Sequence, residues 1–135
     1  MTNSRNILDL TPDAQAYFWR FKAHAEGKGF RWLKDWTVTS TFRDQEFQDK
    51  IYAQGRTSPG KIVTWTRHSR HSSRRAWDFC MLKYGIPQWD VAKVDVNEDQ
   101  IPDYQEMAAV ARELGLNVGA DYGDYCHIEL PEVVG

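Results

Sequence analysis

The sequence predicts an α+β fold, a single domain in which a small antiparallel sheet is flanked by helices. Its 135 residues fit one domain, and no repeat, low-complexity tract or linker divides them. Helical and strand-like patterns alternate along the chain, and several connections are too short for the crossovers that parallel strands require. We therefore expect residues 1–135 to form one unit with antiparallel strand pairing.

The first helix is expected to begin after Thr11, which has the side chain of an N-cap and is followed by Pro12 at the first helical position. Glycines at Gly27 and Gly29 mark its end. Apolar residues recur between these limits at helical spacing and form one stripe: Ala14, Tyr17, Phe18, Phe21 and Ala25.

The next elements are shorter. Trp36–Ser40 alternates and is rich in β-forming residues, which predicts a strand. The segment Asp44–Gln54 predicts a helix that turns Phe47 and Ile51 toward the core. Gly55–Gly60 contains the glycines and proline of a loop.

The second half of the chain predicts three further strands and a helix. Ile62–Thr66, Ala76–Leu82 and Cys126–Leu130 have the composition of strands. Pro102–Leu114 predicts a helix with one apolar face, made of Tyr104, Met107, Ala108, Ala111 and Leu114.

Composition excludes several classes of protein. Seventeen Lys and Arg against nineteen Asp and Glu give a net charge of −2, so binding to nucleic acid through overall charge is not expected. No segment approaches the roughly 18 apolar residues of a membrane span, so no membrane insertion is expected. Two cysteines, Cys80 and Cys126, are too few for a disulfide scaffold and are expected to be reduced thiols.

Two local patterns resemble phosphate sites. Gly55–Lys61 matches G-x-x-x-x-G-K, but Ile62 stands where a hydroxyl must contact magnesium, and the following residues are strand-like. A Gly/Pro turn is the better interpretation. The basic cluster between Arg67 and Arg75 fits a solvated loop, a local nucleic-acid contact or part of a metal site, and the absence of a nucleic-acid-binding motif disfavours the second.

Two His residues and two Asp residues carry the chemistry. His71 and Asp78 are seven residues apart, and Asp124 and His127 are three apart. Neither a helix nor a flat strand brings His71 beside Asp78, so a loop must do so. Two His and one Asp then leave the open fourth position of a catalytic zinc, and Asp124 remains to act on water.

Spacing alone gives a weak signal, because four His among 135 residues is ordinary. We expect His24 to be a surface residue on a polar helix face. His68 lies three residues from His71, but its ten-residue gap to Asp78 fits no motif that we would invoke.

Several segments together resemble the M15 zinc peptidases, the group of D-Ala-D-Ala carboxypeptidases and dipeptidases. Ser69–Asp78 and Asp124–Glu129 are similar to the family motifs S-x-H-x-x-G-x-A-x-D and [D/E]-x-x-H, and Ser40–Arg43 resembles S-G-Y-R. Two segments, Tyr52–Thr57 and Pro59–Thr64, are similar to the phage-endolysin branch of L-alanyl-D-glutamate endopeptidases. Two more, Gly115–Leu116 and Gly119–Gly123, resemble the stretch before the family's last His. The resemblance implies the hedgehog/DD-peptidase fold.

The chain departs from the family pattern at two positions. Arg74 stands where the family has Gly, so its side chain must point away from the metal or narrow the cleft. Tyr122 stands where Trp is usual. Neither departure removes a ligand, so both bear on substrate fit.

The resemblance implies one zinc ion per chain, held by His71, Asp78 and His127. It implies that Asp124 is the general base and proton donor, and that Arg43 stabilises the oxyanion or holds substrate. An exposed turn residue is the alternative for Asp124, and a surface ion pair with Asp44 or Glu46 is the alternative for Arg43. Further candidates for substrate contacts are Ser69, Arg56 and Tyr122. Glu129 is a candidate to support His127 from behind, and Asp121 is a substitute base.

The expected function is hydrolysis of the L-alanyl-D-glutamate bond in the peptidoglycan peptide stem, as a phage endolysin. A D-alanyl-D-alanine carboxypeptidase or dipeptidase is the nearest alternative, and a non-catalytic cell-wall-binding module on the same fold is another. The N-terminus has no pattern of a signal peptide. We therefore expect a monomer made in the host cytoplasm that reaches the wall after release through the membrane.

Overall fold

The computed structural model describes residues 2–62, 64 and 70–132. The helices are α1 (Pro12–Gly27), α2 (Gln45–Ala53) and α3 (Asp103–Glu113). The strands are β1 (Trp36–Ser40), β2 (Ala76–Lys83), β3 (Ile86–Gln88), β4 (Asn117–Val118) and β5 (His127–Glu129). Short 3₁₀ turns lie at Ile7–Asp9, Arg70–Ser73 and Gly119–Tyr122.

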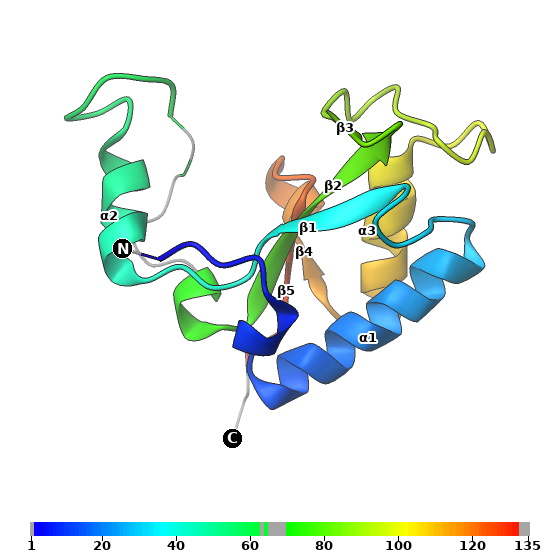
Figure 1. Cartoon of the computed structure of the whole chain (residues 1–135), viewed down its shortest axis with the longest axis horizontal. Helices are drawn as coiled ribbons and strands as arrows, with labels where there is room; N and C mark the ends of the chain where they lie inside the picture. The colour runs from blue at the N-terminus through cyan, green and yellow to red at the C-terminus, as the bar shows by residue number, and fades with distance from the viewer. Residues whose placement is uncertain (1, 63, 65–69, 133–135) are drawn as a thin grey trace.

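One sheet organises the molecule. Its strands follow the order β1-β2-β5-β4, with β3 paired to β2, and every pair is antiparallel. Strand β2 lies in the middle and is buried over all but its last residue. Helices α1 and α3 contact each other and lie on the same side of the view in Figure 1. The predicted α+β class with an antiparallel sheet is confirmed.

Aromatic side chains fill the space between α1 and the sheet. The Phe18 and Trp77 ring centroids are 5.4 Å apart and meet edge to face, and those of Phe21 and Trp36 are 5.5 Å apart in the same arrangement. All four side chains are fully buried. Each such ring buries a large apolar area, so aromatic contacts join α1 to the strands β1 and β2.

Helices α1 and α3 form where periodicity predicts them. The Thr11 hydroxyl accepts a hydrogen bond from the Ala14 amide at 3.4 Å, which caps α1 as expected. The buried residues of α1 are Ala14, Phe18, Phe21 and Ala25, and those of α3 are Asp103, Tyr104, Met107, Ala108, Val110 and Ala111.

Three sequence predictions need correction. In α2 the buried residue is Gln48, while Phe47 and Ile51 are only half-buried. The strand expected over Ile62–Thr66 is wrong at Ile62 and Thr64, which belong to no strand; residues 63 and 65–66 lie outside the described residues. Strands β3 and β4 were not predicted, because two or three residues carry no readable alternation.

The N-terminal segment Thr2–Asn6 lies along residues 40–44, an arrangement not predicted from the sequence. The Ser4 amide donates to the Phe42 carbonyl and the Thr41 amide donates to the Ser4 carbonyl, both at 2.7 Å. The Thr41 hydroxyl bonds to the Asn6 carbonyl at 2.9 Å. This segment therefore braces the chain that follows β1.

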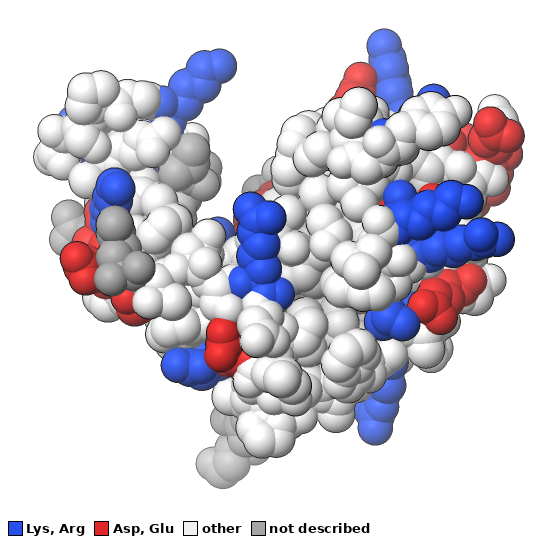
Figure 2. Space-filling view, viewed as in Figure 1, with Lys and Arg blue, Asp and Glu red and all other residues white. Residues whose placement is uncertain are grey.

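Helix α2 and the loop after it form an arm that stands apart from the sheet in Figure 1. Figure 2 shows a hollow between this arm and the rest of the molecule. Charges of both signs are scattered over the face in that view. Among the described residues, no helix has the length and apolar character needed to span a membrane.

Candidate metal centre

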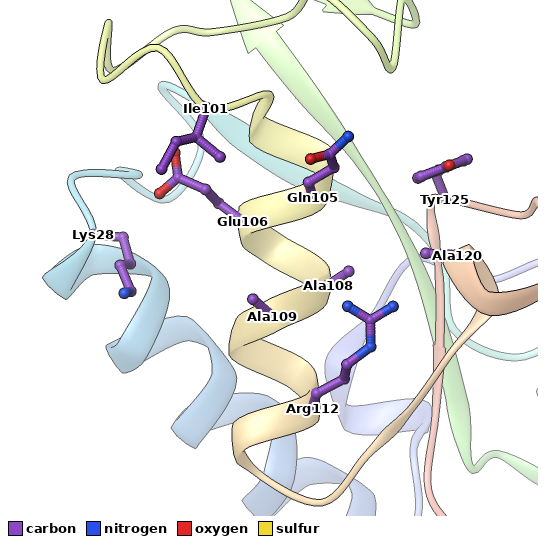
Figure 3. Close-up of a pocket in the computed structure, with 9 residues that line it drawn as sticks. All are labelled: Lys28, Ile101, Gln105, Glu106, Ala108, Ala109, Arg112, Ala120 and Tyr125. Carbon is purple, nitrogen blue, oxygen red and sulfur yellow. The ribbon is translucent and has the colours of Figure 1, made fainter.

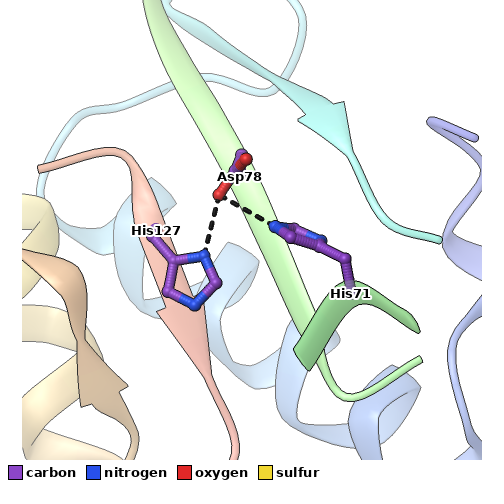
Figure 4. A group of neighbouring side chains, drawn as sticks. All are labelled: His71, Asp78 and His127. Atoms are coloured by element: carbon purple, nitrogen blue, oxygen red, sulfur yellow. Dashed lines mark hydrogen bonds and ion pairs between the residues drawn. The ribbon is translucent and has the colours of Figure 1, made fainter. Parts of the chain in front are cut away.

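His71, Asp78 and His127 meet in the structure, as Figure 4 shows. His71 lies on the turn Arg70–Ser73, Asp78 is in β2 and His127 is in β5, where it pairs directly opposite Asp78. Their exposed fractions are 1%, 9% and 9%. One ligand atom from each lies within 4.8 Å of the others. The antiparallel register of β2 and β5 therefore brings His127 beside Asp78, although the two are far apart in the sequence.

The backbone of Thr41 orients the ring of His71. Its Nδ1 lies 3.1 Å from the Thr41 carbonyl oxygen, and its Nε2 lies 3.1 Å from Asp78 Oδ1. A carbonyl only accepts, so we assign the proton to Nδ1. Nε2 faces Asp78, and once it has lost its proton its lone pair is directed into the site, the arrangement typical of a metal-binding histidine.

Asp78 is the common partner of the two rings. Its Oδ1 is 3.0 Å from His127 Nδ1, and His127 Nε2 is 3.0 Å from Glu129 Oε1. Burial favours neutral Asp78, but the charge of His71 and the hydrogen bonds from both rings outweigh it and hold the Asp78 pKa well below its usual range. Burial also lowers the pKa of His127, yet hydrogen bonds to Asp78 and Glu129 raise it to about 9.

The donor set fits a metal ion. Two imidazole nitrogens and one carboxylate oxygen are the ligands that zinc accepts, and three protein ligands leave a position open. The described part of the chain contains no second His, Cys, Asp or Glu group gathered within the same limit. The trio can therefore hold a metal, with Glu129 behind His127 as the sequence suggested.

Asp124 lies in the loop that leads into β5, with its side chain exposed. Its amide donates to the Gly119 carbonyl at 2.8 Å, and its own carbonyl accepts from the His127 amide at 3.2 Å. The Cys126 thiol donates to its carboxylate at 3.3 Å. Asp124 is thus an exposed loop residue that is tied to a metal ligand by its backbone.

Gly119 is required by the close approach of this loop. A Cβ on Gly119 would overlap the backbone oxygen of Asp124 and would lie 2.8 Å from the Cβ of His127. Only a residue without a side chain fits here, which explains the glycine in the stretch before the last His.

Arg43 points inward to the metal centre. Its Nη2 donates to Asp78 Oδ2 at 3.0 Å and its Nη1 donates to Gln48 Oε1 at 3.5 Å. This inward pairing differs from the surface ion pair with Asp44 or Glu46 that was the alternative. Asp78 therefore contacts both imidazoles through one oxygen and the guanidinium through the other.

Gln48 and Thr41 are site residues that the sequence did not reveal. Gln48 is fully buried and also donates to the Thr64 hydroxyl at 3.2 Å. A polar residue on a short amphipathic helix normally faces solvent, so periodicity assigns it to the surface. Thr41 acts through its backbone carbonyl, which no sequence pattern marks.

The remaining candidates are spread out. Arg56 donates to the carbonyls of Tyr52 at 2.6 Å and Thr64 at 3.1 Å, and its guanidinium lies 3.9 Å from the centre of the Tyr52 ring. These contacts hold its own loop, and the structure does not bring Arg56 to the trio. Ser69 lies outside the described residues, as does His68.

Tyr122 lies at the edge of the centre. It is 66% exposed, and its hydroxyl is 3.5 Å from Glu129 Oε1. Burial of the hydroxyl and the charges of Glu129 and Asp124 raise the pKa of Tyr122 to about 12. Asp121, the substitute base, instead forms an exposed ion pair with Arg112 at 2.6 Å.

Arg74 points away from the metal centre. Its Nη1 donates to the Asp9 carbonyl at 3.0 Å, and the guanidinium lies 3.9 Å from the centre of the Phe42 ring. Its φ of 62° is in the left-handed region that favours glycine, which accounts for the glycine of the family motif. The contacts with Asp9 and Phe42 offset part of the strain here.

Comparison with known proteins identifies the family. No family model matches the chain. The chain is 36% identical over 128 residues to the peptidoglycan L-alanyl-D-glutamate endopeptidase CwlK of Bacillus subtilis (strain 168), covering 90% of this chain and 74% of that protein. The Serratia marcescens L-Ala D-Glu endopeptidase ChiX has the same fold, with a TM-score of 0.64 at 19% identity over 93% of this chain and 84% of ChiX. The chain therefore belongs to the M15 peptidase family, which includes CwlK.

Proposed function

We propose that this chain is a zinc-dependent endopeptidase that hydrolyses the L-alanyl-D-glutamate bond in the peptide stem of peptidoglycan. The observation that carries the proposal is the buried trio His71, Asp78 and His127, built from three separate elements in a chain 36% identical to an enzyme of that activity. Core packing alone gives no reason to gather two imidazoles around one carboxylate.

The trio supplies the ligands for one zinc ion per chain, with His71 binding through Nε2. When bound, zinc supplies a Lewis acid that polarises a carbonyl and lowers the pKa of water toward about 7. Thr41 and Glu129 hold the two rings from behind. These contacts fix the ring orientations before substrate arrives.

Asp124 is the proposed proton carrier. Its carboxylate is exposed, so it can receive a proton from the attacking water and return it to the leaving amine. Burial raises the pKa of the Cys126 thiol, which keeps that group a neutral donor to Asp124. The backbone bond between Asp124 and the His127 amide ties the base to the ligand.

Arg43 is the proposed electrostatic partner of the reacting carbonyl. A guanidinium carries a fixed positive charge, and negative charge develops on the carbonyl oxygen during hydrolysis. The contact with Asp78 anchors one end of the guanidinium at the centre. Gln48, which contacts Nη1, steadies the same group.

The test is digestion of purified cell walls, with the fragments identified by mass spectrometry. The proposal predicts new amino termini at D-glutamate, loss of activity with a chelator and recovery on addition of zinc. Release of single D-alanine residues instead would identify a carboxypeptidase. Wall binding without turnover would identify a binding module.

We further propose that the protein acts as a monomeric phage endolysin that reaches the wall through a membrane lesion. The similarity of Tyr52–Thr64 to the phage-endolysin branch supports this role. Expression in a bacterial host with and without a membrane-permeabilising protein tests it, because an endolysin lyses the cells only when the lesion forms. Lysis without the lesion contradicts the proposal, and light scattering measures the oligomeric state.

A further inference from the structure

The segment that leads from the loop after β3 into the first turn of α3 carries side-chain oxygens at a regular spacing. Within the twelve residues from Asp95 to Glu106, positions 1, 3, 5, 9 and 12 are oxygen-bearing residues: Asp95, Asn97, Asp99, Asp103 and Glu106. This is the ligand spacing of an EF-hand calcium loop, in which the last ligand is a Glu and a helix follows. We call these twelve residues the acidic loop. It contains no Lys or Arg.

The backbone of the acidic loop turns where such a loop must turn. Position 6 is Gly in EF-hands because the chain bends sharply there. Gln100 occupies that position with φ 71°, the left-handed conformation that Gly provides without strain. The Asp95 carboxylate accepts hydrogen bonds from the amides of Asp99 at 3.2 Å and Gln100 at 2.9 Å, so the chain curls around its first acidic residue.

Three buried oxygens of the acidic loop are unsatisfied. Asp103 is fully buried; its Oδ2 accepts from the Val96 amide at 2.7 Å, but its Oδ1 has no hydrogen-bond partner among the described residues. The same holds for Asn97 Oδ1 and Glu106 Oε1. Buried acceptors without a donor are costly, and each one requires an explanation. A cation satisfies several such oxygens at once.

The electrostatics of the acidic loop point the same way. Burial, together with the charges of Asp95 and Asp99, raises the pKa of Asp103 to about 6. Burial and the neighbouring Asp99 raise the pKa of Glu106 to about 7. Figure 3 shows Glu106 turned from α3 toward Ile101 in the acidic loop. The carboxylates of the acidic loop therefore lie close enough together to raise the pKa of Asp103 and Glu106.

We propose that the acidic loop binds one calcium ion through the side chains of Asp95, Asn97, Asp99, Asp103 and Glu106. All of these ligands are oxygens, which suits a hard cation such as calcium better than the zinc that the imidazole-containing centre binds. Position 7 of such loops binds through its backbone carbonyl, which explains why the apolar Ile101 fits there. No residue is shared with the zinc centre.

Calcium binding has a structural consequence. The carboxylates of the acidic loop are not gathered as closely as the ligand atoms of the zinc trio, so the ion draws them together. Asn97 also donates to the Lys28 carbonyl at the end of α1 at 3.1 Å. The closed loop therefore joins the end of α1 to the start of α3.

In the test, calcium chloride is titrated into the zinc-loaded protein. Binding is measured by calorimetry and by the change in melting temperature. We expect one site with a Kd between about 1 µM and 1 mM and a melting temperature that rises with calcium. Asp99→Asn removes a ligand charge and should weaken binding at least about tenfold. Glu98→Gln is the matched control, because position 4 is exposed, supplies no ligand and loses the same charge.

The outcomes separate a built site from diffuse attraction. Equal weakening in Asp99→Asn and Glu98→Gln, or an equal response to magnesium, means that general charge is responsible and overturns the proposal. The absence of heat and of any stabilisation at millimolar calcium also overturns it. Calcium binding that persists in His127→Ala, while zinc is lost, supports two independent sites.

Discussion

At the scale of single residues, one carboxylate organises the candidate centre. Asp78 Oδ1 lies 3.1 Å from His71 Nε2 and 3.0 Å from His127 Nδ1, and Oδ2 accepts from Arg43. Each of its partners therefore depends on the position of β2. A change at Asp78 should disturb both the metal ligands and the guanidinium.

Loss of any one ligand should release the zinc. His71→Ala, Asp78→Ala and His127→Ala each leave two ligands, too few for a stable zinc site, so metal analysis of each purified variant should find far less than one zinc per chain. The exposed His24 provides the control, and His24→Ala should keep its zinc. Full zinc occupancy in His127→Ala would contradict the ligand assignment.

Asp124→Asn should retain zinc and fold but lose hydrolysis. Positioned proton transfer typically contributes about 10²–10⁴-fold to the rate, and an amide cannot accept the proton. Asp121→Asn is a matched control three residues before Asp124 in the chain, because Asp121 pairs with Arg112 on the surface. If both variants digest cell walls at the normal rate, the base lies elsewhere.

Arg43→Lys separates two roles of the guanidinium. Lys keeps the charge but cannot contact Asp78 and Gln48 together as the planar fork does. A fall in kcat with little change in KM indicates stabilisation of transition-state charge, whereas a raised KM alone indicates anchoring of the substrate. Unchanged kinetics in a zinc-loaded, folded sample would leave Arg43 with a structural role only.

At the scale of elements, the turn Gly119–Tyr122 positions the loop between β4 and β5. The carbonyl of its first residue accepts a hydrogen bond from the amide of the candidate base, and a Cβ on that residue would press against a zinc ligand. The geometry of the centre therefore depends on a turn that supplies no ligand.

Gly119→Ala should impair hydrolysis more than it impairs folding. The added methyl overlaps the Asp124 backbone oxygen and pushes against His127, so the base and the ligand must shift. We expect a lower kcat in the zinc-loaded protein, measured beside far-ultraviolet circular dichroism. Gly27→Ala is the control because a Cβ there meets nothing within 4 Å. Equal activity of both variants would show that the loop relaxes freely.

The elements also show what the sequence can and cannot predict. The stripes of α1 and α3 are long enough to fix their type and their buried faces, because packing follows period in both. Helix α2 is too short for that rule, and the contacts of Gln48 with Arg43 and Thr64 override its polar character. The strand expected at Ile62 fails because strand-like composition does not ensure a pairing partner.

At the scale of the whole molecule, the zinc centre joins the turn Arg70–Ser73 to β2 and β5. Spacing along the chain could suggest His71 with Asp78, and Asp124 with His127, but only the strand register brings the two pairs together. The family motifs predicted that the two pairs belong to one site, but not which strands bring them together. Thr41 and Gln48 were missed because their roles arise from tertiary contacts.

Removal of zinc should lower the stability of the whole domain. A ligand that binds only the folded state stabilises it, so a chelator should reduce the melting temperature and abolish hydrolysis, and added zinc should restore both. The same treatment of His127→Ala should leave its melting temperature nearly unchanged, since no zinc is present to remove. An equal fall in both proteins would show that the chelator acts at another site, such as the acidic loop.

The N-terminal segment Thr2–Asn6 sets the minimal length of chain that could be grafted into another protein as a functional domain. The family motifs lie between Ser40 and Glu129, which suggests a natural minimal unit for grafting into another protein. Yet Ser4 and Asn6 hold Thr41, whose carbonyl orients His71, and Asn3 pairs with Arg43. A graft cut at the motif boundaries would keep every ligand and lose the support beneath two of the site's residues. The smallest portable unit therefore begins at Thr2.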